Sequence, residues 1–531
     1  ARLLVTAAGQ TQAVPLGEFK ATETGPLKAA FTASGRVANL AVSGEAWIEF
    51  DGFYRNTITL SGAEPVRIEE LAIEIPIKPE FATVWSPAEY YPVQLGRSPQ
   101  EKHESAVRHG MRIGDEERGL QFSSVNAQRQ ILVPKQKEYV VRYEFINAPT
   151  AIEKPHELTF ALQALPVRPR SPLYRSFKVD DCTFTSDATK ELFNIAPLYT
   201  EGWSRHWNYL NFWNEQAFDP TFKEQLKAAY ASMWEQRKQT QCMYLNMVAT
   251  DGNTPEYRTY RYEWAGKDAP DPMPYDPATK MKTQMVSIDP ATPSYEDFYM
   301  WHLDKTVRYL TDNGKFPIHC YLDCTASHRD YMKRLYTIMK AVHPLNQVFV
   351  HMSGDNNMYA WAFSDWLIEG EENTANYHAR RASDPTLPED YTRILDVPKV
   401  ASRYSPFAFG DKFFLYQFWG WKNSEPARAH LWALHFIHDG TTWAAGGPAS
   451  KQALIDLGWD EKVEFVPYWR KGTGIRVTSS AQGVIASGWK RGEGNLLVMV
   501  LNDSDAAESC ELTVDFAGFG FASAAVKCHD Y

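Results

Sequence analysis

Alternating apolar and polar positions dominate the first part of the chain. The runs RVANLAV (36–42), VRIEELAIEI (66–75) and KEYVVRYEF (137–145) follow the two-residue period of half-buried β-strands. Turn-forming residues separate these runs, and helical periodicity is almost absent. The pattern therefore predicts an N-terminal β-sandwich over residues 1–178, and the proline-rich stretch LPVRPRSPLY (165–174) is predicted to be a linker.

The central part of the chain changes to a helical period interrupted by short apolar runs. Helical segments occur at 221–239 and 295–314. The apolar runs are CMYLNMV (242–248), PIHCYLD (317–323), NQVFVHMS (346–353) and DWLIEGE (365–371). Alternation of helices and buried strands over about 280 residues is typical of a (β/α)8 barrel. A doubly wound sheet is the competing interpretation, but no G-x-G-x-x-G motif follows these strands. We predict a (β/α)8 TIM-like catalytic barrel over residues 179–462.

The last seventy or so residues return to the strand pattern. The runs GVIASGWKR, GNLLVMVLND and CELTVDF are joined by Gly and Asn/Asp turns. They predict a small C-terminal β-sandwich over residues 463–531. The chain is thus expected to be a multidomain protein that combines an α/β part with two all-β parts.

Composition adds one feature to this picture, which is a high aromatic content. The 531 residues include 17 Trp, 27 Tyr and 28 Phe, or 14% of the chain. Aromatic rings are rigid apolar platforms on which the C–H faces of sugars stack, although filling a core is the alternative role. The net charge of −10 and the lack of a basic cluster argue against nucleic acid as a partner. No apolar stretch approaches the roughly 20 residues needed to span a membrane.

The start of the sequence bears on location. It reads ARLLVTAAGQ, with neither an initiator Met nor a signal peptide, which suggests a processed form. We expect a periplasmic or secreted bacterial protein.

An isolated acid ends one of the apolar runs. PIHCYLD closes on Asp323, and in a barrel the carboxyl ends of the strands face the active site. The alternative role is to cap the helix that follows, but Thr325 and Ser327 are better placed for that. Asp323 is therefore predicted to be catalytic.

A second acid stands at an analogous position, because DWLIEGEE brings Glu371 and Glu372 to the end of a later strand. Two carboxylates on different strand ends are the minimal apparatus for cleaving a glycosidic bond. We predict that Asp323 is the nucleophile of a retaining mechanism and that Glu371 is the acid/base. Glu372 is the alternative proton donor.

Polar and aromatic residues near these acids are predicted to bind the substrate. His351 and Asp355 follow the strand between the two acids, although a structural His and a simple turn are the alternatives. Further segments combine aromatic with polar residues more densely than a core requires; they contribute Trp203, Arg205, Trp207, Arg403 and Trp419.

A metal site is the remaining possibility in this region. His319, Cys320, Cys324 and His328 lie close in sequence, but they lack a C-x-x-C pair and the usual zinc spacing. We predict neither a metal nor a cofactor.

The order of β-sandwich, barrel and small β-domain, with strands ending in YLD, VHMSG and GEE, resembles the family 123-like glycoside hydrolases, an uncharacterised bacterial group. The resemblance to family 123 implies cleavage of β-linked N-acetylgalactosamine by an adjacent Asp-Glu pair, with the substrate's acetamido group as nucleophile. This chain departs from that pattern. Its Asp-Glu dipeptides are Asp115-Glu116 and Asp460-Glu461, and neither is at a central strand end.

The separated Asp323 and Glu371 instead resemble the catalytic pair of the retaining α-N-acetylgalactosaminidases of families 129 and 101. That resemblance implies an Asp nucleophile and a Glu acid/base on different barrel strands. The expected function is a glycoside hydrolase that removes a terminal sugar, of N-acetylgalactosamine or galactose type, from a glycan or oligosaccharide. The alternatives are a non-catalytic carbohydrate-binding protein on a barrel scaffold, a substrate-assisted β-N-acetylgalactosaminidase, and a polysaccharide lyase with a Tyr or His base.

Overall fold

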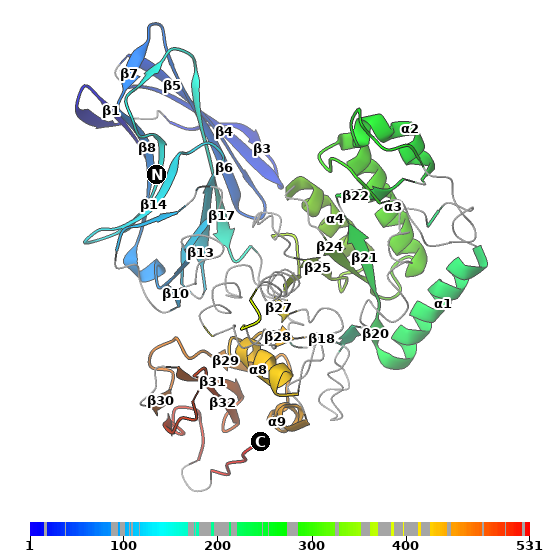
Figure 1. The fold of residues 1–531 in the computed structure, drawn as a ribbon. Helices are drawn as coiled ribbons and strands as arrows, with labels where there is room; N and C mark the ends of the chain where they lie inside the picture. The colour runs from blue at the N-terminus through cyan, green and yellow to red at the C-terminus, as the bar shows by residue number, and fades with distance from the viewer. Residues whose placement is uncertain are drawn as a thin grey trace. The chain divides into compact units, whose positions relative to one another are not determined.

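The computed structural model divides the chain into two compact units (Figure 1). The first unit is mainly residues 1–170, and the second runs mainly from residue 171 to residue 531. For Asp323, His351 and Glu369 the structure describes the backbone only. The described residues are 1–14, 18–37, 39–86, 94–95, 101–105, 107, 110–115, 117–167, 175, 177–179, 193–195, 212–213, 220–246, 248–252, 254–272, 285–323, 329–351, 362–369, 384–386, 397, 412–415, 425–442, 448–479, 483–504, 506–522 and 526–531.

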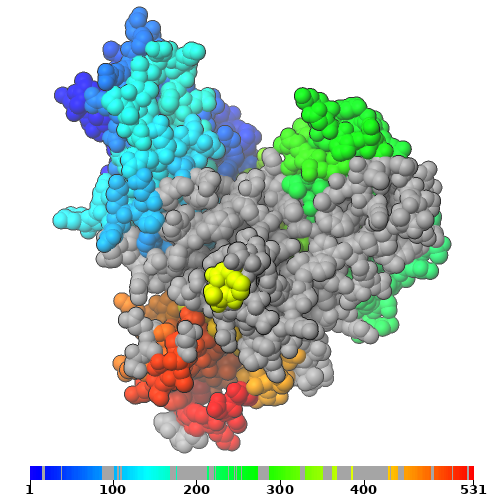
Figure 2. All heavy atoms as spheres, viewed as in Figure 1, coloured from blue at the N-terminus to red at the C-terminus, as the bar shows by residue number. Residues whose placement is uncertain are grey.

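The first unit is built from two antiparallel sheets, whose described surface is blue to cyan in Figure 2. In spatial order, the six-stranded sheet contains β11 (His103–Ser105), β14 (Arg129–Pro134), β15 (Tyr139–Ile146), β8 (Glu70–Ile77), β1 (Arg2–Ala7) and β2 (Gln10–Ala13). The nine-stranded sheet contains β10 (Gln94–Leu95), β9 (Val84–Ser86), β12 (Met111–Gly114), β13 (Gly119–Ser124), β17 (His156–Leu165), β6 (Phe53–Gly62), β5 (Leu40–Glu49), β4 (Lys28–Val37) and β3 (Lys20–Thr24).

The alternation in the sequence explains how these sheets pack. Along β5, every second residue from Leu40 to Ala46 is buried and the residues between them are exposed, so one face of the strand lies against the core. Residues from both sheets, such as Leu60 and Ile73, belong to the same buried cluster. The expectation of a strand-rich N-terminal part is confirmed.

Two runs predicted as single strands are each divided in the structure. RVANLAV contains a hairpin, because Val37 at the end of β4 pairs with Leu40 at the start of β5. VRIEELAIEI contains β7 (Val66–Ile68), which pairs with β16 (Thr150–Ile152), and the first part of β8. Neither break carries Gly or Pro, the residues that mark turns most strongly, so the alternating pattern runs through both.

The second unit contains a six-stranded parallel sheet, and the four apolar runs of the central part are all strands in it (Figure 1). Its order is β21 (Cys242–Asn246), β24 (His319–Asp323), β25 (Val348–His351), β26 (Trp366–Glu369), β27 (Lys412–Leu415) and β28 (Thr441–Thr442). Each strand therefore lies beside the next strand of the sheet along the chain. A separate parallel sheet contains β18 (Phe177–Val179), β19 (Phe193–Ile195) and β20 (Gln239–Thr240).

Helices connect or precede these strands. Between β24 and β25 runs α4 (Arg329–Val342), whose buried residues recur at helical spacing and form one apolar stripe: Tyr331, Met332, Leu335, Met339 and Val342. The other described helices of this part are α1 (Pro220–Arg237), α2 (Pro255–Trp264), α3 (Pro293–Leu310) and α8 (Glu425–Phe436), and a two-stranded sheet joins β22 (Ala249–Asp251) to β23 (Met285–Ser287). Among the described helices, none combines the length and apolar character needed to cross a membrane.

The C-terminal strands share a core with two helices. They form a sheet of β29 (Val463–Val466), β31 (Val484–Arg491) and β32 (Leu496–Asn502) and a pair of β30 (Ile475–Ser479) with β33 (Cys510–Val514). Phe436 of α8 stacks on Trp489 of β31 with 4.1 Å between ring centroids. Leu454 and Leu457 of α9 (Pro448–Leu457) belong to the same buried cluster.

A buried ion pair joins these parts. The Arg175 guanidinium donates two hydrogen bonds to the carboxylate of Asp439, at 2.7 and 3.0 Å, and the two side chains are only 5% and 1% exposed. Arg175 Nε also donates to the carbonyl of Val463, and the guanidinium lies 4.5 Å from the ring centre of Trp459. Trp489 donates its indole N–H to Asp439 at 3.0 Å. The pair is therefore satisfied on both sides.

Asp439→Asn is expected to lower the free energy of unfolding by about 3–5 kcal/mol, because it leaves a buried guanidinium without its counter-charge. Urea denaturation followed by circular dichroism measures this loss. Arg334→Met is the matched control, since Arg334 pairs with Glu296 and Asp297 at the surface. Its expected cost is about 1 kcal/mol or less. Equal losses in the two variants would contradict the role of the buried pair.

Candidate active site at the carboxyl ends of the parallel strands

The strand register brings three polar residues into one row. Asn246 at the end of β21 is the register partner of Asp323 at the end of β24. The last pair between β24 and β25 is Leu322 with Val350, so Asp323 and His351 each follow that pair directly. We call Asn246, Asp323 and His351 the carboxyl-end row. The structure thus brings together two of the predicted site residues, Asp323 and His351, at the backbone level.

Asn246 was not among the predicted site residues. Its side chain is half-buried, and its Oδ1 accepts the N–H of Val248 at 3.0 Å, which stabilises the turn that ends β21. The sequence did carry a signal, because Asn246 is a polar residue inside the apolar run CMYLNMV. That run forms β21, the neighbour of β24, and it ends at the same edge of the sheet as Asp323.

Glu369 is a second acid that the sequence analysis passed over. It is the last described residue of β26 and the register partner of Leu415. In a strand every second residue has the same alternation, so Glu369 has that of Leu367. Leu367 is the register partner of Val350, which in turn is the partner of Leu322. Asp323 belongs to the opposite alternation. Glu369 and Asp323 therefore occupy opposite alternate positions in the backbone register.

The alternate positions along β24 and its neighbours carry different groups. Cys320 has the same alternation as Leu322, and burial raises the pKa of its thiol, with the nearby charge of Asp365 adding to the rise. The carboxylate of Asp365 in turn pairs with Lys340 of α4 at 2.9 Å. The opposite face carries a stack of Phe349 on Trp366, with centroids 5.3 Å apart.

At the amino ends of the strands, polar side chains make hydrogen bonds that stabilise the fold. His319 Nδ1 accepts the backbone N–H of Gln347 at 3.0 Å, so the ring proton is on Nε2, which donates to Thr240 Oγ1 at 2.7 Å. Burial, helped by the positive charges of Lys340 and His343, lowers the pKa of His319 to about 3. The ring is neutral, and both of its nitrogens are occupied.

Because both ring nitrogens make hydrogen bonds, His319 has no nitrogen left to bind a metal ion. Within the described ranges, no group of three or more His, Cys, Asp or Glu side chains is arranged to hold a metal ion. Cys324 and His328 lie outside the described residues.

Two more polar residues fix the same amino edge. Asn346 is fully buried; its Oδ1 accepts the N–H of Ile318 at 2.9 Å, and its amide donates to the carbonyl of Met339 at 2.8 Å. Asp365 accepts the N–H of Val348 at 2.8 Å. These bonds set where β24 and β25 begin, and thereby fix the positions at which both strands reach the carboxyl edge.

The remaining predicted site residues lie outside the described part of the chain, and their roles stay predictions. They are Glu371, Glu372, Asp355, Trp203, Arg205, Trp207, Arg403 and Trp419.

The Asp-Glu dipeptides are engaged in structural contacts where the structure describes them. Asp460 pairs with Arg491 at 2.7 Å, and Glu461 accepts the backbone N–H of Arg175 at 2.7 Å. Asp115 accepts two backbone N–H groups in a turn of the first unit. Their positions agree with the departure from the adjacent Asp-Glu pattern of family 123.

Comparison with known proteins links the first unit to carbohydrate-active enzymes. Residues 1–130 match the family model described as "Glycoside hydrolase 123, third domain". This match confirms the resemblance to family 123 glycoside hydrolases and supports the expectation of a glycoside hydrolase. A comparison with curated protein sequences finds no match.

Solved structures give weaker likenesses. The α-N-acetylgalactosaminidase NagBb from Bifidobacterium bifidum is 10% identical, with a TM-score of 0.34, over 96% of this chain and 97% of that one. A mutant of Kfla1895 in complex with cyclobis-(1->6)-alpha-nigerosyl is 8% identical, with a TM-score of 0.38, over 97% and 93%. A putative aldose 1-epimerase from Escherichia coli K12 is 12% identical, with a TM-score of 0.20, over 30% and 78%. With TM-scores below 0.5, these likenesses carry no argument about this chain.

The buried His319 makes a pH-dependent contribution to stability. Its folded pKa is about 3, whereas an unfolded His titrates near 6.5, so between these values the unfolded state binds one more proton. The contribution is present above pH 6.5 and is lost as the pH falls toward 3. His319→Gln is therefore expected to reduce the slope of unfolding free energy against pH by about 1.4 kcal/mol per unit between pH 5.5 and 4. Urea titrations of both proteins at these pH values measure it, and equal slopes would contradict a neutral buried ring.

Proposed function

We propose that this protein is a retaining glycoside hydrolase whose catalytic part is a (β/α)8 barrel within residues 179–462. The sequential order of the six parallel strands supports this architecture, because a doubly wound sheet reverses its order at a switch point. The family 123 domain at residues 1–130 supports a carbohydrate substrate. The proposed substrate is a glycan with a terminal sugar of N-acetylgalactosamine or galactose type.

The observation that carries the proposal is the position of Asp323 in the carboxyl-end row. The four residues before it in β24 are at most 2% exposed, so its backbone is held in a packed strand. A nucleophile must be fixed beside the anomeric carbon, and a rigid strand end meets that requirement. His351, its neighbour in the row, is proposed to bind a sugar hydroxyl.

The proposed acid/base is Glu371, with Glu372 as the alternative. One strand separates β24 from β26, and neighbouring strands are about 4.8 Å apart, so the two backbones are roughly 10 Å apart. Retaining enzymes hold their carboxyl groups about 5–5.5 Å apart, a distance that two acidic side chains reaching toward each other achieve. The proposed sugar contacts are Asp355, Trp203, Arg205, Trp207, Arg403 and Trp419.

Substitutions at the four acids test the assignment on aryl glycosides with good and poor leaving groups. Asp323→Asn is expected to abolish turnover on all of them. Glu371→Ala is expected to lower kcat/KM about 10²–10⁴-fold for poor leaving groups and to spare dinitrophenyl glycosides, which need little proton donation. Glu369→Gln is the matched control from the same segment and should retain activity, because Glu369 is part of β26 and does not belong to the proposed catalytic pair.

Three results would change the assignment. Loss of activity in Glu372→Ala but not in Glu371→Ala would move the proton donor by one residue. Loss of activity in Glu369→Gln alone would overturn both Glu371 and Glu372 as the proton donor. Binding of glycans without turnover of any glycoside by the unmodified protein would favour a carbohydrate-binding protein.

The stereochemistry of the product is a separate prediction. Because Asp323 is proposed to attack the anomeric carbon directly, the first product should keep the anomeric configuration of the substrate. Proton NMR during the first minutes of hydrolysis, before mutarotation, measures this. An inverted product would exclude Asp323 as a nucleophile.

A further inference from the structure

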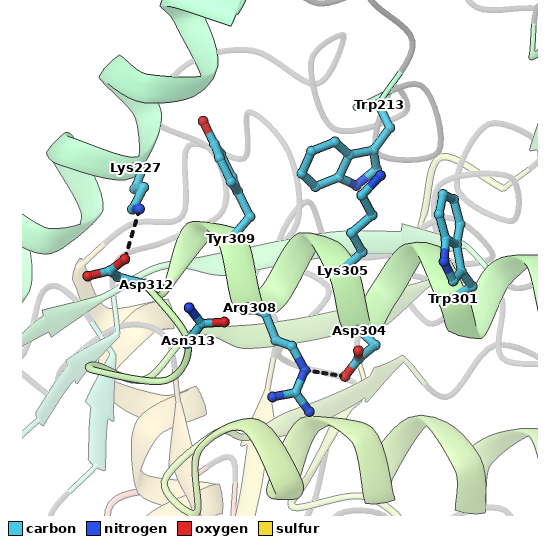
Figure 3. Close-up of a pocket in the computed structure, with 9 residues that line it drawn as sticks. All are labelled: Trp213, Lys227, Trp301, Asp304, Lys305, Arg308, Tyr309, Asp312 and Asn313. Atoms are coloured by element: carbon cyan, nitrogen blue, oxygen red, sulfur yellow. Dashed lines mark hydrogen bonds and ion pairs between the residues drawn. The ribbon is translucent and has the colours of Figure 1, made fainter.

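A groove of about 460 Å³ lies along α3 (Figure 3). Trp301, Lys305 and Tyr309 come from α3, and Lys227 comes from α1 on the other side. Trp213, a residue of the segment GWSRHWNYLNFWNE, closes it from above in this view. The groove therefore combines three aromatic rings with several charged side chains.

Two of the three rings are held in place by contacts within the protein. Trp213 donates its indole N–H to Thr306 Oγ1 at 3.0 Å and lies edge-on to Tyr309, with ring centroids 5.3 Å apart. Trp301 is 52% exposed, which is unusual for the largest apolar side chain. Lys305 extends between the two indoles; its Nζ is 4.0 Å from the ring centre of Trp213 and 4.6 Å from that of Trp301. The exposed ring of Trp301 is a surface on which a flat ligand can stack.

The charges of the groove leave one cation in excess. Asp304 pairs with Arg308 at 2.8 Å, and Asp312 pairs with Lys227 at 3.0 Å. Among the described residues, no carboxylate is in a salt bridge with Lys305, whose Nζ lies over the two indole rings. The ammonium of Lys305 is thus positioned to bind an anionic group placed over Trp301.

The groove is distinct from the carboxyl-end row. Asp312 and Asn313, which line it, lie between the end of α3 and the start of β24 at His319. They therefore mark the amino end of the strand, whereas Asp323 is at the carboxyl end. Between Trp301 and Tyr309 the helix rises about 12 Å, so the groove extends along α3 and not across the sheet edge.

We propose that this groove is a second carbohydrate-binding site, which takes a pyranose ring that carries a carboxylate or a sulfate. The C–H face of the ring stacks on Trp301, and the anionic group accepts hydrogen bonds from Lys305. Asn313 and Asp304 supply hydrogen bonds to the hydroxyl groups. The site goes beyond the proposed hydrolysis, because binding here requires no catalytic residue.

Calorimetric titration of the full chain at low salt tests the proposal with three tetrasaccharides and one ion. The probes are unsulfated chondroitin (carboxylate), chondroitin 4-sulfate (carboxylate and sulfate), N-acetylchitotetraose (neutral) and inorganic sulfate. Both chondroitin probes are expected to bind more tightly than the neutral probe, and sulfate alone is expected to bind at least tenfold more weakly. A gain from the added sulfate identifies sulfate as the preferred anion, and equal affinities identify the carboxylate.

Variants assign the binding to the groove. Trp301→Ala is expected to weaken chondroitin binding at least tenfold. Lys305→Met should reduce the affinity for chondroitin to that for the neutral probe, and Lys305→Arg should restore most of it. Tyr262→Ala is the matched control, because Tyr262 is an exposed ring on α2, 60% exposed, that does not line the groove. Its affinity should equal that of the unmodified protein.

The contrary results are equally specific. Unchanged affinity in Trp301→Ala, with circular dichroism confirming the fold, would overturn the site. Equal binding of neutral and charged probes would overturn the role of Lys305, and sulfate binding as tight as chondroitin would mean an adventitious ion only. Failure here is separable from failure of the proposed hydrolysis, because Asp323→Asn should leave chondroitin affinity unchanged. Conversely, Trp301→Ala should leave the turnover of aryl glycosides unchanged.

Discussion

The pairing of Arg175 with Asp439 is the interaction on which the second unit depends. Removing two charges from water costs several kcal/mol per ion, and here each hydrogen-bonding group of the pair that the structure describes has a partner. Asp439 adopts a left-handed backbone conformation with φ of 63° and lies two residues before β28. The pair therefore fixes where the last strand of the parallel sheet begins, and it connects that strand to Val463 and Trp489 in the C-terminal sheet.

The amino ends of the parallel strands carry structural hydrogen bonds, and the carboxyl ends carry the candidate site. At the amino ends, His319, Asn346 and Asp365 each accept a hydrogen bond from a backbone N–H of a neighbouring segment, so the strands start at defined residues. A defined start gives a defined finish, since every residue of a packed strand advances the chain by about 3.3 Å. The alignment of the carboxyl-end row therefore depends on hydrogen bonds made at the amino ends of the strands.

The sequence predicted the strands of the central part because each is a continuous apolar run between helical segments. It singled out Asp323 because the run PIHCYLD ends there. It did not single out Glu369, because DWLIEGEE carries three acids near its end, and the sequence alone does not say that Glu369 still belongs to the strand. Contacts between distant segments were equally out of reach, as for Arg175 with Asp439 or Lys305 with Trp213, because each requires the whole fold to be known.

The core shared by α8, α9 and the C-terminal strands has a consequence for synthesis of the chain. Phe436 emerges from the ribosome roughly 50 residues before Trp489, the ring on which it stacks. At about 5–20 residues per second, this apolar surface lacks its partner for roughly 3–10 s. During that interval the nascent chain carries an exposed aromatic cluster, and a chaperone that covers such surfaces would find its binding site there. A ribosomal pause that occurs when Phe436 has left the exit tunnel and Trp489 is still inside it would prolong this interval.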